Sequence, residues 1–175
     1  MNKKLIIILA LFLCGTALIF VISKENTFQK TTAVGLIAPD FEITDSLNGS
    51  KISSSELKGK DLFINFWASW CQPCREEMPS IETLFKEMQS NDNFRMITIV
   101  YNDSIENALK YMKKNGYTFP VYSDPDGITS KNFGITGVPE TYIINKNGIL
   151  TKRVLGAAEW NSSDAKLFIS SLLIE

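Results

Sequence analysis

The sequence predicts an α/β domain in which helices flank a mixed central sheet. Strand-like and helix-like segments alternate between residues 61 and 133, a pattern typical of parallel strands covered by helices. Two more strand-like segments then follow in direct succession around Asn147-Gly148, which is an antiparallel hairpin signal. A second such pair, Asn48-Gly49, stands between two short apolar segments upstream. We therefore also expect a β-hairpin extension at the N-terminal end of the domain.

The first elements of the domain are short. Residues 41–44 and 51–52 flank Asn48-Gly49 and should pair as the N-terminal hairpin. Ser53 and Glu56 have the spacing of a capping box, in which each side chain bonds the backbone N–H of the other residue. This pair predicts the start of a helical turn.

A strand and a helix meet at the middle of the sequence. Residues 61–68 form a mostly apolar and aromatic run interrupted by Asn65, which predicts a strand buried on both faces. After a short turn, apolar residues recur three and four apart over residues 71–88, as on one face of a helix. Pro73 falls in its first turn, where a missing N–H costs nothing. Pro79 lies inside the helix and should kink it.

The remaining elements alternate and then pair. Apolar periodicity and the intervening turn residues predict a strand, a helix, a short strand, a short helix, two hairpin strands and a closing helix. In order, these are residues 94–101, 104–114, 119–122, 127–133, 140–145, 149–155 and 161–173. There is no internal repeat, and the folded part has the common size of one domain.

The N-terminal end differs from the rest in composition. Residues 5–22 carry no charge, and a helix of 18 residues spans about 27 Å, just enough to cross the hydrocarbon core of a bilayer. Two lysines precede the run, which favours an N-terminus in the cytoplasm and a domain outside it. We expect a membrane anchor or signal segment over residues 1–23, a linker over 24–34 and the domain over 35–175.

Cleavage of the leader is the alternative to an anchor, because its length lies between that of a signal peptide and that of a span. No clear cleavage site follows the run, and its apolar length favours an uncleaved anchor. Cys14 is a candidate for lipid attachment, although Leu13 before it is bulky where such sites prefer a small residue. With an anchor, a cleaved leader or a lipid-attached leader alike, the domain is expected to be exported. We expect a single-pass cell-membrane protein whose C-terminal domain lies on the extracytoplasmic side, periplasmic or outer.

Composition excludes several classes of function. Lysine and arginine number 18 against 19 aspartates and glutamates, and no basic run indicates a nucleic-acid partner. No glycine-rich nucleotide-binding motif occurs, so no organic cofactor is expected. The chain has three cysteines and no histidine, whereas a structural zinc site takes four such ligands. We therefore expect no metal.

The motif that carries chemistry is Cys71-Gln-Pro-Cys74 at the predicted helix start. A helix N-terminus carries about half a positive charge and unpaired N–H groups, which stabilise a thiolate on Cys71. Cys74 lies one turn inside, where it is shielded and placed to resolve a mixed disulfide. A purely structural bridge is the alternative, but such a short loop gains little from loop-closure entropy. The pair is therefore predicted to be redox-active.

These motifs resemble the thioredoxin superfamily and, within it, the exported TlpA/ResA/DsbE-like thiol–disulfide oxidoreductases. The similar segments are Ala-Pro-Asp-Phe at 38–41, Leu-Lys-Gly-Lys at 57–60, the Trp-Cys-x-Pro-Cys region at 66–77 and Gly-Val-Pro-Glu-Thr at 137–141. The resemblance implies a thioredoxin-like fold and a membrane-anchored enzyme that acts outside the cytoplasm.

The resemblance also implies catalytic residues beyond the cysteines. Glu77 matches an acidic residue that this group uses near its thiols, where a carboxylate raises a thiol pKa by repulsion and can relay protons. The alternative for Glu77 is a solvated helix glutamate. Pro139 matches a cis-proline that faces the cysteine pair, and its alternative is an ordinary trans proline, since cis bonds are only about 5–6% of X–Pro bonds. The flanking Gly137-Val138 and the strand that follows favour cis.

A partner-binding surface is implied beside the cysteines. It consists of Trp70, Val138, Pro139 and Glu140. For Glu140, an exposed glutamate at a strand entry is an equal alternative.

The chain departs from cytoplasmic thioredoxins in two places. Asn65 stands where those proteins have a buried aspartate, and an amide cannot act as a base, so proton handling should pass to Glu77. Gln72-Pro73 replaces Gly-Pro between the cysteines, so the reduction potential of thioredoxin does not carry over.

The first function expected is reduction of disulfides in exported proteins, with apocytochrome c as the leading substrate class and a membrane thiol carrier as electron donor. Disulfide oxidation or isomerisation by the same cysteines is the alternative, since sequence does not fix the direction. A peroxiredoxin-like peroxidase ranks low, because no Pro-x-x-x-Thr-x-x-Cys motif precedes Cys71. A redox-inactive binding module of the same fold disagrees with the intact cysteine pair.

Overall fold

The structure is a computed structural model that describes residue 12 and residues 32–173. Residues 31–175 form a compact unit distinct from residues 1–30. The Thr32 hydroxyl donates a hydrogen bond to the Asn132 carbonyl (3.2 Å), so the last residues of the predicted linker contact the domain. The predicted anchor and Cys14 lie outside the described residues, apart from residue 12. Among the residues described, no helix has the length and apolar character needed to cross a membrane.

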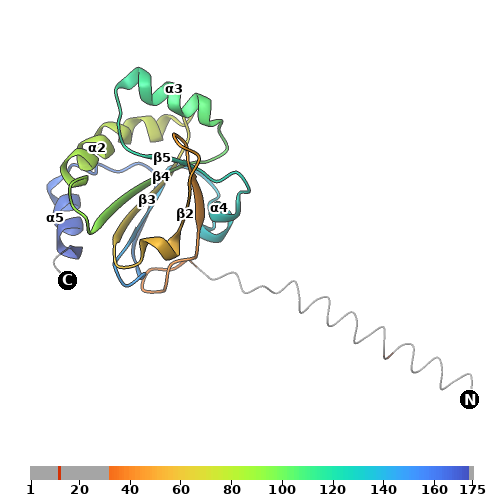
Figure 1. Cartoon of the computed structure of the whole chain (residues 1–175). Helices are drawn as coiled ribbons and strands as arrows, with labels where there is room; N and C mark the ends of the chain where they lie inside the picture. The colour runs from red at the N-terminus through yellow and green to blue at the C-terminus, as the bar shows by residue number, and fades with distance from the viewer. Residues whose placement is uncertain (1–11, 13–31, 174–175) are drawn as a thin grey trace, which may run out of the picture. The chain divides into compact units, whose positions relative to one another are not determined.

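Seven strands form one mixed sheet in the order β2-β1-β5-β4-β3-β6-β7 (Figure 1). Their bounds are β1 Glu42–Asp45, β2 Lys51–Ser53, β3 Asp61–Trp67, β4 Phe94–Val100, β5 Val121–Ser123, β6 Glu140–Ile144 and β7 Leu150–Leu155. The three central strands β3, β4 and β5 are parallel, and all other pairs are antiparallel. The N-terminal hairpin joins the sheet beside β5, as an extension of it. The predicted fold class is confirmed.

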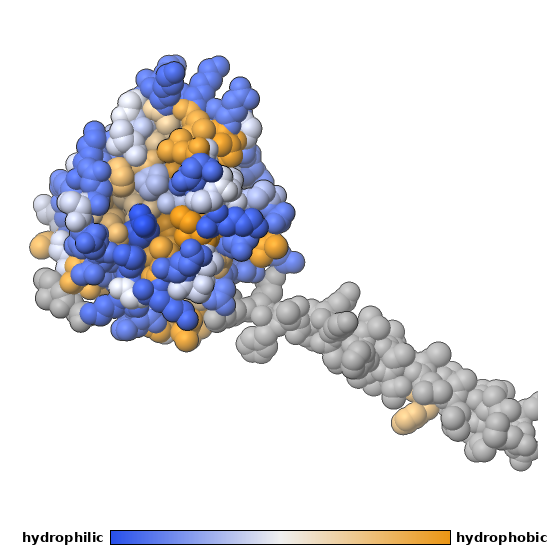
Figure 2. All heavy atoms as spheres, in the orientation of Figure 1, coloured by the Kyte–Doolittle hydropathy of each residue, from blue (hydrophilic) through white to orange (hydrophobic). Residues whose placement is uncertain are grey.

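Helices cover both faces of this sheet. They are η1 Ser54–Leu57, α2 Gln72–Met88, α3 Ile105–Asn115, α4 Ile128–Phe133 and α5 Ser163–Leu172. One apolar core joins the sheet to α2, α3 and α5, and a second joins its other face to α4 and η1. In Figure 1, α2 and α5 accordingly lie on one side of the sheet and α4 on the other. On the surface drawn in Figure 2, apolar residues are scattered among hydrophilic ones.

The strand and helix that meet at the cysteines follow the sequence pattern closely. Every residue of β3 is buried, as its apolar run predicts. Helix α2 begins after Cys71, which is its N-cap, and runs through Pro79 to Met88. Pro73 lies in the first turn, where helices tolerate the missing N–H. The cysteines therefore stand where the central strand passes into a helix.

Ser53 and Glu56 form the predicted capping box, and the helical turn that they begin is a 3₁₀ helix of four residues. One short strand differs from the prediction. The strand expected over 119–122 begins only at Val121, because the Phe119 N–H donates to the Glu82 carboxylate and Pro120 has no N–H to donate. Local side-chain bonding thus shortens the strand.

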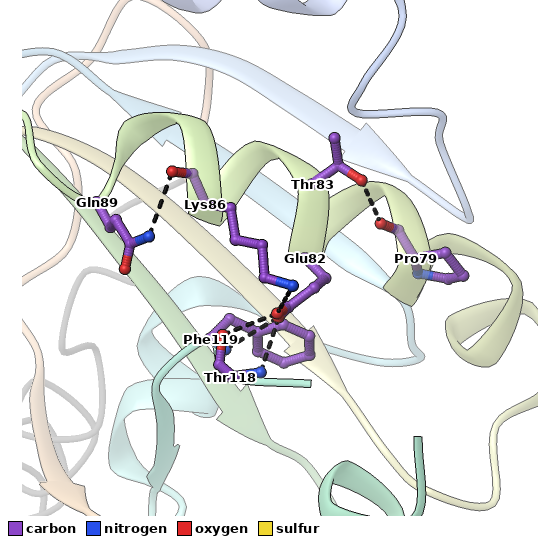
Figure 3. Close-up of polar contacts among 7 residues, drawn as sticks. All are labelled: Pro79, Glu82, Thr83, Lys86, Gln89, Thr118 and Phe119. Carbon is purple, nitrogen blue, oxygen red and sulfur yellow. Dashed lines mark hydrogen bonds and ion pairs between the residues drawn. The ribbon is translucent and has the colours of Figure 1, made fainter. Parts of the chain in front are cut away.

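Glu82 on α2 fixes the segment that leads into β5 (Figure 3). Its carboxylate accepts hydrogen bonds from the backbone N–H of Thr118 (2.8 Å), the Thr118 hydroxyl (2.7 Å) and the Phe119 N–H (3.2 Å). Lys86, one turn further along α2, forms an ion pair with it at 3.1 Å. Burial alone raises the pKa of Glu82, but these donors outweigh it and hold the pKa below its usual range.

Replacing Glu82 with glutamine should lower the free energy of unfolding by about 1–3 kcal/mol at pH 7, since charge-assisted hydrogen bonds are lost. A lowered pKa stabilises the fold above the unfolded-state value and loses that effect as the pH falls through the folded-state value. The deficit of E82Q should therefore shrink on acidification below about pH 4.3, the ordinary value for glutamate. Urea unfolding at several pH values measures it, with Glu87→Gln as a control in an exposed ion pair. A pH-independent deficit would contradict this account.

Candidate active site

Cys71 and Cys74 form a disulfide at the start of α2, with their Cα atoms 5.3 Å apart. The Cys71 Sγ accepts a hydrogen bond from the Cys74 backbone N–H at 3.2 Å. Cys71 is 4% exposed and Cys74 is fully buried. After reduction, a thiolate on Cys71 would face this N–H group and the positive end of the α2 dipole, which lower a thiol pKa. The geometry therefore suits Cys71 for attack and Cys74 for resolution.

Asn102 and Asp103, which follow β4, hold the turn that carries Cys71. The Asp103 carboxylate accepts the Ser69 N–H at 2.7 Å, and the Asn102 carbonyl accepts the indole N–H of Trp70 at 3.0 Å. Asn102 has a φ of 49°, a left-handed conformation that asparagine tolerates better than most residues. Burial raises the pKa of Asp103, but the hydrogen bonds from Ser69 and its neighbours outweigh it and lower that pKa. No motif in the sequence marks Asn102 or Asp103, although both follow the central strand β4 at the edge of the sheet where the cysteines lie.

The segment around Pro139 lies beside the cysteine pair. The Val138–Pro139 peptide bond is cis, as expected. The Val138 carbonyl oxygen is 3.5 Å from the Cys71 Sγ. Trp70, next to Cys71 in sequence, is 57% exposed. Trp70 and Val138 therefore both adjoin Cys71, Trp70 in sequence and Val138 by contact.

Glu140 is placed differently from the other three predicted partner-binding residues. It is buried and is bound by Arg153 and by the Tyr142 hydroxyl, so the alternative of an exposed glutamate is wrong. Its strand partner in β3 is Phe66, in the core on the α4 side. Residues paired across two strands point to the same face of a sheet, so the Glu140 carboxylate lies with Phe66 on the face away from α2. Its role toward a partner stays a prediction.

Glu77 is buried on α2, one turn after Cys74, with only 2% of its surface exposed. Its Oε1 accepts a hydrogen bond from the Asn65 Nδ2 (2.9 Å), and its Oε2 accepts from the Ala158 N–H (3.1 Å) and the Trp160 indole N–H (3.3 Å). The alternative of a solvated helix glutamate is therefore wrong. Burial raises the pKa of Glu77, and these hydrogen bonds offset the rise only in part. The sequence held no signal for Ala158 or Trp160, which lie 81 and 83 positions further along the chain.

Replacing Glu77 with glutamine should shift alkylation of the reduced cysteines to lower pH. The ionised carboxylate lies on the same face of α2 as Cys74, and like-charge repulsion raises a thiol pKa, so its removal lowers that pKa. The rate of iodoacetamide labelling against pH measures the shift. Glu76→Gln is the matched control, because Glu76 is the exposed neighbour of Glu77. An identical profile in wild type and E77Q would separate Glu77 from the thiol chemistry.

Known proteins resemble this chain over most of its length. Residues 34–153 match the AhpC/TSA family model. The chain is similar to the thiol–disulfide oxidoreductase ResA of Bacillus thuringiensis subsp. konkukian, with 31% identity over 153 residues and 86% of each chain covered. It is 33% identical to ResA of Bacillus subtilis over 128 residues, which cover 73% of this chain and 70% of the relative.

Solved structures share the fold along almost their whole length. A protein from Bacteroides thetaiotaomicron aligns with a TM-score of 0.74 at 30% identity, over 82% of this chain and 91% of that one. A thiol:disulfide interchange protein of the thioredoxin family from Chlorobium tepidum aligns with a TM-score of 0.67 at 30% identity, over 80% and 98%. With its cysteine pair at the N-terminus of α2, the chain belongs to the thioredoxin-like AhpC/TSA family and is a ResA-like thiol–disulfide oxidoreductase.

Proposed function

We propose that this oxidoreductase reduces disulfides in exported proteins, with apocytochrome c as the leading substrate class in cytochrome c maturation. The observation that carries the proposal is the position of Cys71, at the N-terminus of α2 and beside the cis-proline segment. A polypeptide received along Trp70, Val138 and Pro139 would bring its disulfide to Cys71. The resemblance to the exported reductases supports this substrate class.

The reaction proceeds by two exchanges. The Cys71 thiolate attacks one sulfur of the partner disulfide, and the other partner sulfur leaves as a thiolate and takes up a proton. Cys74 then gives its proton to the Glu77 carboxylate and attacks the Cys71 Sγ. This step forms the bond between Cys71 and Cys74 and releases the second partner sulfur, which takes up the proton. The partner gains two electrons and the enzyme ends as the disulfide found in the structure.

Return to the dithiol requires an electron donor outside the cytoplasm, and we propose a membrane thiol carrier. The apolar run of residues 5–22, preceded by two lysines, supports a single-pass anchor with the domain on the extracytoplasmic side. An anchor of this kind keeps the domain close to a donor in the same membrane.

The direction of the reaction is tested with the full chain in detergent micelles. We expect catalysis of insulin disulfide reduction by dithiothreitol, together with an equilibrium against glutathione that favours the enzyme disulfide. Rapid oxidation of a reduced test protein by the disulfide form, without insulin reduction, would instead establish the oxidase or isomerase alternative. Absence of both activities would overturn the proposal.

A further inference from the structure

The side chain of Asn65 bridges Glu77 and the strand that follows Pro139. Its Nδ2 donates to the Glu77 Oε1 and to the Thr141 Oγ1, each at 2.9 Å. Asn65 and Thr141 are both fully buried, and they are paired across β3 and β6. The Asn65 Oδ1 is buried without a hydrogen-bond partner. One end of this carboxamide makes both bonds while the other makes none.

This arrangement matches only one protonation state of Glu77. An ionised carboxylate only accepts hydrogen bonds, so the Asn65 NH₂ group suits it. A protonated Glu77 would direct an O–H at that NH₂ group, and two donors would face each other. Rotation of the carboxamide by 180° exchanges its oxygen and nitrogen. The Oδ1 would then accept both the Glu77 O–H and the Thr141 O–H, since a hydroxyl can donate or accept.

The other contacts of Glu77 decide which oxygen takes the proton. Ala158 and Trp160 reach Oε2 through N–H groups that can only donate, so the proton is placed on Oε1, the oxygen that faces Asn65. Within residues 32–173 no charged side chain bonds to Glu77. Glu159, between those two donors, is exposed, as are Arg75 and Glu76 on α2. The buried titratable group of the preceding turn is Cys74 once the disulfide is reduced.

We propose that Asn65 is a positioning residue that reverses its carboxamide as Glu77 gains and loses its proton, with the Thr141 hydroxyl reversing in step. Asn65 thereby keeps a hydrogen bond to Glu77 in both protonation states. When the proton of Cys74 moves to Glu77, the new Glu77 O–H meets the Asn65 oxygen and not its NH₂ group. Thr141 lies two residues after Pro139, so the same reversal reaches the segment that adjoins Cys71. The inference rests on the proposed function only for the source of the proton.

The wild-type protein tests the reversal directly. In the full chain in detergent micelles, NMR follows the Glu77 carboxyl ¹³C signal and the Asn65 carboxamide ¹⁵N signal against pH. We expect both signals to titrate with one midpoint, and the Asn65 signal to be constant in Glu77→Gln. An Asn65 signal that is constant in wild type while Glu77 titrates would overturn the proposal.

Variants test the link to the proton. Asn65→Leu should raise the pKa of Glu77, because both forms lose their bond to Asn65 and the charge-assisted bond of the ionised form is the stronger of the two. Thr141→Val should weaken the response of the Asn65 signal to pH. Thr98→Val is the matched control, since Thr98 is a buried threonine on β4 whose hydroxyl bonds the Pro120 carbonyl instead.

An unchanged Glu77 titration in folded N65L would overturn the role of Asn65. If N65L does not fold, the wild-type and T141V titrations decide the matter without it. Insulin reduction measured on the same samples keeps the two proposals separate. An inactive protein with the expected NMR response would contradict the function and leave the reversal standing.

Discussion

Replacing Cys71 with serine should abolish the reduction of insulin disulfides, leaving only the uncatalysed background. The loss is expected on the order of 10³-fold or more, because the first exchange cannot start without the Cys71 thiolate as nucleophile. A serine hydroxyl is not appreciably ionised near neutral pH, whereas a thiol at a helix N-terminus is. Turbidity from precipitating insulin B chain, with dithiothreitol as reductant, measures the rate.

The controls for C71S separate lost chemistry from lost structure. Far-ultraviolet circular dichroism and thermal unfolding should show a folded domain, compared with Cys74→Ser, which also lacks the disulfide. Cys14→Ser should retain the activity, since the reaction uses only the pair in α2. Turnover at the wild-type rate in both C71S and C74S would show that the roles assigned to the two cysteines are wrong.

The strand, the helix and the cysteine pair were predictable because their signals are local. The apolar run of β3 and the three-and-four spacing along α2 each specify an element from adjacent residues. The cysteines stand at the junction of these two elements, so their position at a helix N-terminus followed directly. The cis bond before Pro139 was predicted from the family resemblance together with the flanking Gly137-Val138 and the strand that follows.

The surroundings of Glu77 and Glu140 were not predictable, because they depend on tertiary contacts. Glu77 is bound by a loop more than 80 positions away, and its burial follows from how α5 and that loop pack against α2. Glu140 follows Pro139 directly, yet the alternation of side chains turns it to the other face of the sheet. Sequence proximity to an active-site residue therefore did not determine which face a carboxylate occupies.

Replacing Cys74 with serine should stop turnover at the mixed disulfide. Cys71 can still attack a partner disulfide, but no second thiol lies one helical turn away to displace the partner, so the covalent complex accumulates. The burial of Cys71 supports this outcome, because exogenous thiols reach a sulfur of a residue that is 4% exposed less readily than an internal cysteine does.

The complex is measured on non-reducing gels after C74S is expressed as the full chain and its membranes are treated with an alkylating agent. We expect a higher-mass band that disappears when dithiothreitol reduces the mixed disulfide. C71S and the C71S/C74S double variant should lack this band. Mass spectrometry of the band identifies the partner. A partner with a Cys-x-x-Cys-His haem-attachment motif would support apocytochrome c, and a membrane thiol carrier would identify the electron donor. A band of equal intensity in C71S would show that Cys71 is not the attacking thiol, because serine at that position cannot form the bond.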